Sequence, residues 1–104
     1  MTSAVLAGIN VEVDAEGYLT DNNQWNMEIG EAISESLGIQ LSPDHWKLIN
    51  FAREDFAVKK QSPGLRRISK ATGMGMKIIY KLFPKGPGKL IAKIAGVPKP
   101  KSCL

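Results

Sequence analysis

The chain is poor in the side chains from which disulfides, metal sites and catalytic triads are built. It has one cysteine, Cys103, and one histidine, His45, among 104 residues. A single cysteine excludes an intramolecular disulfide and fits a reducing compartment. No second cysteine or histidine is present to complete a metal site, and no glycine-rich phosphate loop follows a strand, so we expect neither a metal nor a cofactor. His45 falls in the first turn of a predicted helix, where we expect a capping or structural role.

The sequence also lacks a long hydrophobic run. The apolar stretch 4–9 is too short to cross a membrane, and no basic segment precedes it, as one would in a signal peptide. We therefore expect a soluble, cytoplasmic protein with no membrane partner. With 43% hydrophobic residues, a chain of this length suffices for one domain, 1–104, with one modest core.

Acidic residues are scarce in the second half of the chain. Residues 53–104 contain thirteen lysines and arginines but only two acids, a net charge of +11, whereas residues 1–52 contain eight acids and one base, a net charge of −7. Such charge separation speeds association with an acidic partner, protein or nucleic acid. A solvated basic surface that binds nothing specific is the alternative interpretation.

Hydrophobic periodicity and capping residues predict a mainly α-helical fold. Alternating apolar residues favour a small β-hairpin within residues 1–19. The clearest helix start is Ser42-Pro43-Asp44, because serine caps, proline suits the first turn and aspartate complements the positive helix end. We expect a compact, orthogonal helical bundle over residues 26–95. The predicted strands are 4–6 and 9–13, and the predicted helices are 27–37, 43–59, 65–71, 76–83 and 89–95.

The last nine residues, 96–104, predict a flexible and extended C-terminal arm that carries the only thiol. Two prolines in this segment disfavour both a packed helix and an inner strand. An exposed cysteine is used for its reactivity rather than for its packing. From Gly96 to Cys103 the arm can reach about 25–29 Å at ~3.3–3.6 Å per residue. The arm residues predicted to extend the arm, to steer it and to lower the thiol pKa are Pro98, Lys99, Pro100 and Lys101.

Two short basic helices around Gly73-Met74-Gly75 superficially resemble a helix-turn-helix. Their cations would suit phosphates, but the second helix has no Asn, Gln or Arg with which to read bases. Apolar packing explains most of the pattern, so we do not expect direct binding of nucleic acid. The cations concerned are Arg66, Arg67, Lys70, Lys77 and Lys81.

Several motifs spread over nearly the whole chain resemble the DsrC/TusE family. This family comprises gamma-subunit-like partners of dissimilatory sulfite reductase and the TusE component of the tRNA 2-thiouridine sulfur relay. Phenylalanine-proline, glycine-proline and a penultimate cysteine at fixed spacing are the most specific signal. The motifs are Glu16-Gly17-Tyr18-Leu19, Leu41-Ser42-Pro43-Asp44-His45-Trp46, Leu82-Phe83-Pro84-Lys85-Gly86-Pro87, Lys93-Ile94-Ala95-Gly96-Val97-Pro98-Lys99-Pro100 and Cys103-Leu104.

The resemblance implies that Cys103 is a persulfide carrier. Family members that act with sulfite reductase have a second cysteine eleven positions earlier, where this chain has Ala92. The resemblance therefore favours the one-cysteine, TusE-like branch and excludes an intramolecular trisulfide. Arg66 matches a basic position of the family, where it could support the arm or a partner. The segment 71–80 is shorter than in the family.

The function that we expect is that of a cytoplasmic sulfur carrier, a sulfurtransferase-type protein rather than a stand-alone enzyme. The resemblance implies an upstream persulfide donor of the TusBCD/DsrEFH type. It also implies a downstream acceptor protein, for which a tRNA thiouridylase is one option. The alternative is a non-catalytic or regulatory binding module, either a partner subunit in sulfite reduction or sulfur oxidation or a helix-turn-helix-like DNA binder.

Overall fold

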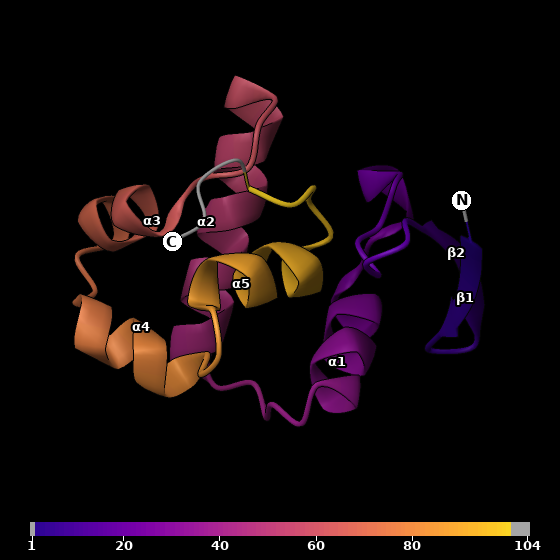
Figure 1. Ribbon diagram of the computed structural model, residues 1–104, viewed down its shortest axis with the longest axis horizontal. Helices are drawn as coiled ribbons and strands as arrows, with labels where there is room; N and C mark the ends of the chain where they lie inside the picture. Colours follow the sequence, from indigo (N-terminus) through magenta and orange to yellow (C-terminus); the bar gives the residue numbers. More distant parts are fainter. Residues whose placement is uncertain (1, 101–104) are drawn as a thin grey trace.

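The computed structural model describes residues 2–100 of the protein (Figure 1). The described chain forms one antiparallel hairpin and a set of α-helices, which confirms the mainly helical fold class that the sequence predicts. None of the described helices is long and apolar enough to span a bilayer. The elements are β1 (Thr2–Leu6), β2 (Ile9–Val13), the 3-10 helix η1 (Asn22–Gln24), α1 (Met27–Ser36), α2 (Pro43–Lys59), α3 (Leu65–Thr72), α4 (Met76–Leu82) and α5 (Pro87–Ala95).

The N-terminal hairpin presents one apolar face to the helices. Strands β1 and β2 pair from Leu6 opposite Ile9, next to a two-residue turn, and β1 begins two residues earlier than the sequence pattern predicts. Val11 and Val13 of β2 are buried, as period-two alternation requires when one face of a sheet is covered. A bridge from Val13 to Leu19 then returns the chain toward the core.

His45 completes the predicted start of α2. The backbone N–H of Ser42 donates to His45 Nδ1 at 3.0 Å, and the Ser42 hydroxyl accepts from the His45 backbone N–H, forming a reciprocal capping box. His45 Nε2 lies 2.8 Å from the Leu82 carbonyl oxygen, and its ring meets Phe83 edge-on at 4.9 Å. Because Nδ1 accepts, Nε2 carries the proton and donates to Leu82. The structural role predicted for this histidine is confirmed.

Helix α5 lies at the centre of the helical part (Figure 1), where it packs against α1 and α2. It begins at Pro87, two residues before the predicted start, because proline at the first helical position gives up no hydrogen bond. Its side chains Ile91 and Ile94 are fully buried in a hydrophobic core to which every other α-helix contributes. The fully buried core residues on those helices are Ile29, Leu48, Ile49, Leu65, Ile68 and Ile79.

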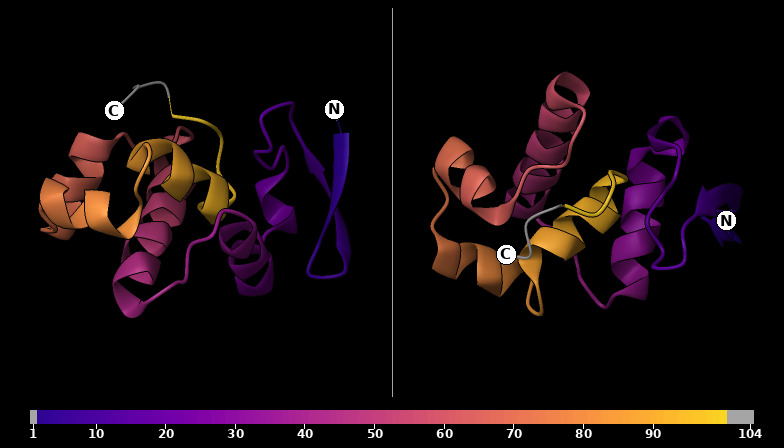
Figure 2. Two further views of the ribbon diagram at one scale, coloured as in Figure 1. Left: turned by 60° about the horizontal axis from the view of Figure 1, so that its bottom comes forward. Right: turned by 45° about the horizontal axis from the view of Figure 1, so that its top comes forward.

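The charge separation of the sequence becomes a separation in space. In all three orientations the hairpin and the α3–α4 pair lie at opposite ends of the molecule (Figure 2). The hairpin and α1 carry acidic residues, whereas α3 and α4 carry only basic ones. The two ends of the molecule therefore differ in the sign of their charge, a distribution that favours one orientation of an approaching charged molecule.

Asp55 on α2 is tied to α3 by Arg67. Arg67 Nε and Nη2 donate to the two carboxylate oxygens at 2.8 and 2.5 Å, and Asp55 is buried. The hydrogen bonds from Arg67 hold the pKa of Asp55 below its ordinary value.

This ion pair is expected to make stability depend on pH at the acidic end. Its contribution is fully present above the unfolded-state pKa of Asp55, about 3.9, and is lost as the pH falls through the lower folded-state value. Urea unfolding of wild type and Asp55→Asn between pH 2 and pH 7 measures the difference. The difference in the free energy of unfolding between the two proteins should become smaller below about pH 4. A difference that stays constant with pH would contradict a stabilising Asp55–Arg67 ion pair.

Candidate functional site

After the C-terminal end of α5 the described chain turns back across the helical body. Gly96 adopts a left-handed conformation with φ 73°, its N–H donates to the Lys93 carbonyl at 3.3 Å, and the Val97 N–H donates to the Ala92 carbonyl at 3.1 Å. This pair of bonds is a Schellman motif, and Val97, which follows it, is fully buried. The direction in which residues 97–100 depart is thus fixed by hydrogen bonds and packing.

Trp25 and Arg53 hold the last two carbonyls of α5. Trp25 Nε1 donates to the Ile94 carbonyl at 2.7 Å, and Arg53 Nη1 donates to the Ala95 carbonyl at 2.8 Å. The guanidinium carbon of Arg53 lies 4.0 Å from the Trp25 ring centroid, so the two side chains also stack on one another. Burial lowers the pKa of Arg53 from its ordinary value. A cation at this end of a helix complements its negative dipole.

Sequence reasoning missed this pair, which we call the Trp25–Arg53 clamp. An isolated tryptophan in the polar segment 20–26 was the one available signal, because a large aromatic with a single N–H donor usually finds both a surface and an acceptor. Nothing in the sequence indicates which carbonyl it meets, since Trp25 and Ile94 are 69 positions apart.

Replacing Trp25 by phenylalanine is expected to lower the free energy of unfolding by about 1 kcal/mol. The aromatic ring stays beside Gly96 and Arg53, while the bond from Nε1 to the Ile94 carbonyl is lost. Urea denaturation of the two proteins gives the value. An unchanged midpoint would show that this bond does not anchor α5.

Residues 96–100 lie against the body, so the predicted C-terminal arm does not protrude over these residues. Val97 and Pro100 are buried, whereas Pro98 and Lys99 are exposed. The Ser62 hydroxyl donates to the Pro98 carbonyl, and Lys99 Nζ lies 3.1 Å from a Glu16 carboxylate oxygen. The reason is that Gly96 turns the chain back across the bundle, so that α5 and this segment share the core.

Lys99 therefore has a partner within its own chain. Its side chain is 42% exposed and that of Glu16 is 58% exposed, and pairs in such surroundings contribute little to stability. The contact is weak enough to be exchanged for one with another protein. The prediction that Lys99 steers the arm into a partner stays a prediction. Cys103 and Lys101 lie outside the described residues, and the roles predicted for them stand on the sequence and the resemblance.

Arg66 lies on the exposed face of α3, beside Arg67 and Lys70, which line a surface depression with it. The loop that precedes α3 contains Ser62, the residue that contacts Pro98. The loop at the N-terminal end of α3 thus contacts residues 96–100 through Ser62. No ion pair of Arg66 is found among residues 2–100.

Over residues 2–100 no group of three or more histidines, cysteines and carboxylates converges as a metal site. A depression between α1 and the start of α2 is lined by Glu31, Ser34, Glu35 and Trp46, among others. Ala92, at the position where some relatives of the predicted family have a second cysteine, is buried in α5.

Comparison with protein families gives one assignment. The family model described as "DsrC like protein" matches residues 5–104. The chain is 38% identical over 107 aligned positions to the protein named Sulfurtransferase TusE of Escherichia coli K12, covering 96% of this chain and 98% of the relative. Sulfurtransferase TusE of Salmonella typhimurium is 37% identical with the same coverage.

Solved structures agree with the sequence comparison. The oxidized gamma-subunit of the dissimilatory sulfite reductase (DsrC) from Archaeoglobus fulgidus superimposes with a TM-score of 0.86 at 32% identity, covering 99% of this chain and all of that one. DsrC of Allochromatium vinosum gives 0.87 at 33% identity, covering 98% and 97%. The fold thus defines a class of small helical proteins. In this class the last helix ends at a glycine cap, and the residues that follow fold back onto the helices. The chain belongs to the DsrC family, as its motifs predict.

Proposed function

We propose that this protein is a cytoplasmic sulfur carrier of the TusE type, in which Cys103 holds a persulfide sulfur between two partner proteins. The observation that supports it best is the family match, which extends to residue 104 and so includes the single, penultimate cysteine. The relatives it aligns with over nearly their full length are named sulfurtransferases.

The proposed step is a thiol–persulfide exchange. The Cys103 thiolate attacks the terminal sulfur of a donor Cys–S–SH, the donor S–S bond breaks, and the donor cysteine leaves as a thiolate while Cys103–S–SH forms. The reverse sense of the same exchange passes the sulfur to an acceptor thiolate. No outside oxidant or reductant is needed, because the transferred sulfur keeps its oxidation state. A trisulfide within the chain is excluded, because Ala92 occupies the second cysteine position.

The docked segment limits how far the thiol can travel. With residues 96–100 held, the four residues from Pro100 to Cys103 span at most about 14 Å at ~3.6 Å per residue. Release of the segment back to Gly96 extends the reach to about 25–29 Å. The contacts to be broken are one exposed ion pair, one hydroxyl bond and the packing of Val97 and Pro100. A partner that offers equivalent contacts can replace them.

We propose an upstream donor of the TusBCD/DsrEFH type and a downstream acceptor protein, with a tRNA thiouridylase as one acceptor. A non-catalytic partner subunit is the second candidate, because a similar structure is the gamma-subunit of a sulfite reductase. A reconstituted relay separates the two. For a carrier, labelled sulfur should reach the acceptor from the donor only when the chain is added; transfer at the same rate without the chain would contradict carriage.

A further inference from the structure

Helix α4 exposes large apolar side chains that no part of the described chain covers. Met76 is 37% exposed, Ile78 49% and Tyr80 47%. At about 3.6 residues per turn, Lys77 and Lys81 lie in the middle of the exposed arc, with Met76 and Tyr80 on one side and Ile78 on the other. We call these five residues the α4 face. Two cations framed by apolar and aromatic side chains form a mixed surface of the kind found at protein interfaces.

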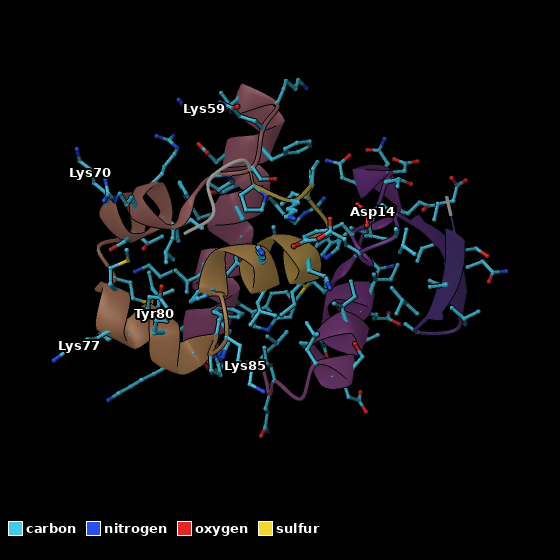
Figure 3. The ribbon with its side chains drawn as sticks, in the orientation of Figure 1. Asp14, Lys59, Lys70, Lys77, Tyr80 and Lys85 are labelled. Carbon is cyan, nitrogen blue, oxygen red and sulfur yellow. The ribbon has the colours of Figure 1, made fainter. Side chains whose placement is uncertain are left out.

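The part of the sequence that contains the α4 face carries one sign of charge. From residue 56 to the end of the sequence there is no aspartate or glutamate. Lys70 of α3 and Lys77 of α4 project at the same edge of the molecule, and Lys85 follows just after α4 (Figure 3). Within residues 2–100 the ion pairs are those of Arg67 and Lys99, so the lysines of the α4 face are not neutralised there. A molecule that binds the α4 face would therefore need carboxylates to complement these lysines.

The chemistry of the face favours a protein over a nucleic acid or a membrane. Phosphate binding would be served by lysines alone and gives exposed Ile78 no partner, and α4 has no Asn, Gln or Arg to read bases. A membrane-bound helix buries one continuous apolar face and turns its cations away. In α4 the apolar residue Ile79 is buried in the protein, and the exposed apolar side chains flank the lysines on both sides.

We propose that the α4 face docks the protein that exchanges sulfur with the C-terminal segment, through an apolar contact ringed by carboxylates on that partner. This inference rests on the proposed function for the partner's identity. Tyr80 and Ile78 supply the apolar contact, while Lys77 and Lys81 supply attraction and orientation. Docking through the body keeps the partner bound while the sulfur is exchanged.

Calorimetric titration with a purified TusBCD-type donor and a thiouridylase-type acceptor tests the proposal. Ile78→Ser, and separately the double variant Lys77→Glu/Lys81→Glu, should weaken binding of at least one of them by about tenfold or more. The wild-type affinity should also fall with added salt. Matched controls are Val58→Ser, an 80% exposed apolar residue on α2, and Lys59→Glu/Lys60→Glu at the far end of that helix (Figure 3); both should bind as wild type.

Each other outcome overturns the proposal. Unchanged binding of both proteins by the α4 variants, or no binding by wild type, excludes the α4 face as the dock. The same holds if the variants lose only retention on tRNA or duplex DNA, or change only the self-association of the chain in light scattering. Circular dichroism verifies that the variants fold. Sulfur loading of Cys103 by a small polysulfide should be equal in wild type and in all the variants. Failure of this loading would count against the proposed function, whereas a change in partner binding alone bears only on the α4 face.

Discussion

Serine in place of Cys103 is expected to reduce sulfur delivery through the reconstituted relay to the level seen without the protein. The hydroxyl of serine is nearly the same size but is neither ionised at neutral pH nor able to form a persulfide. A free thiol with a pKa near ~8.5 is a few per cent thiolate at that pH, which suffices for exchange with an activated sulfur. Labelled sulfur that appears on the acceptor measures the rate.

A chemical control is available because the chain has no second thiol. Alkylation of wild type with iodoacetamide should abolish delivery as completely as the substitution does. The stability of Cys103→Ser should equal that of wild type, so that lost delivery is not lost folding. A tenfold lower rate corresponds to an activation free energy that is about 1.4 kcal/mol higher. If Cys103→Ser still delivered sulfur to the acceptor at a tenth of the wild-type rate, the result would favour the partner-subunit alternative.

Gly96→Ala is expected to lower the free energy of unfolding by about 2–5 kcal/mol, the sum of backbone strain and overpacking. Gly96 has φ 73°, and a Cβ built on it would lie 2.5 Å from Trp25 Cδ1 and 3.0 Å from Trp25 Cβ. Trp25 cannot easily retreat, because its indole nitrogen is bonded to α5 and its ring is stacked under Arg53. The substitution thus displaces Trp25 and disturbs the Trp25–Arg53 clamp at the C-terminal end of α5.

Gly73→Ala is the matched control. Gly73 also follows the end of a helix, with φ 74°, but a Cβ there would meet nothing within 4 Å. It should cost only the backbone strain, about 1–2 kcal/mol. Urea unfolding of both variants gives the difference. Equal losses would show that contact with Trp25 adds nothing, and that the path of residues 96–100 is set by the backbone turn alone.

The sequence predicts well those features that local chemistry determines. Ser42, Pro43 and His45 are neighbours, so the start of α2 could be found from capping preferences. The end of α5 at Gly96 follows from glycine's access to positive φ. Periodic apolar residues likewise located the five helices to within about two residues.

Contacts between distant residues could not be predicted in this way. Trp25 meets Ile94, Arg53 meets Ala95, and Lys99 meets Glu16, across separations of 69, 42 and 83 positions. Each joins segments that come together only in the folded chain. Prolines and lysines in 97–100 suggested a free segment, because local composition does not report that Val97 and Pro100 find an apolar surface after the turn. The candidate thiol itself was indicated by the prolines and lysines that precede it, and its role as a persulfide carrier by the family resemblance.

The mass of the intact protein after reaction with a persulfide donor tests the central claim most directly. If Cys103 carries the sulfur, wild type gains the mass of one sulfur atom, the gain is removed by dithiothreitol, and Cys103→Ser gains nothing. Fragmentation should place the added sulfur on the C-terminal peptide. An unmodified wild type after exposure to small and protein persulfides alike, or an equal gain on Cys103→Ser, would contradict the account.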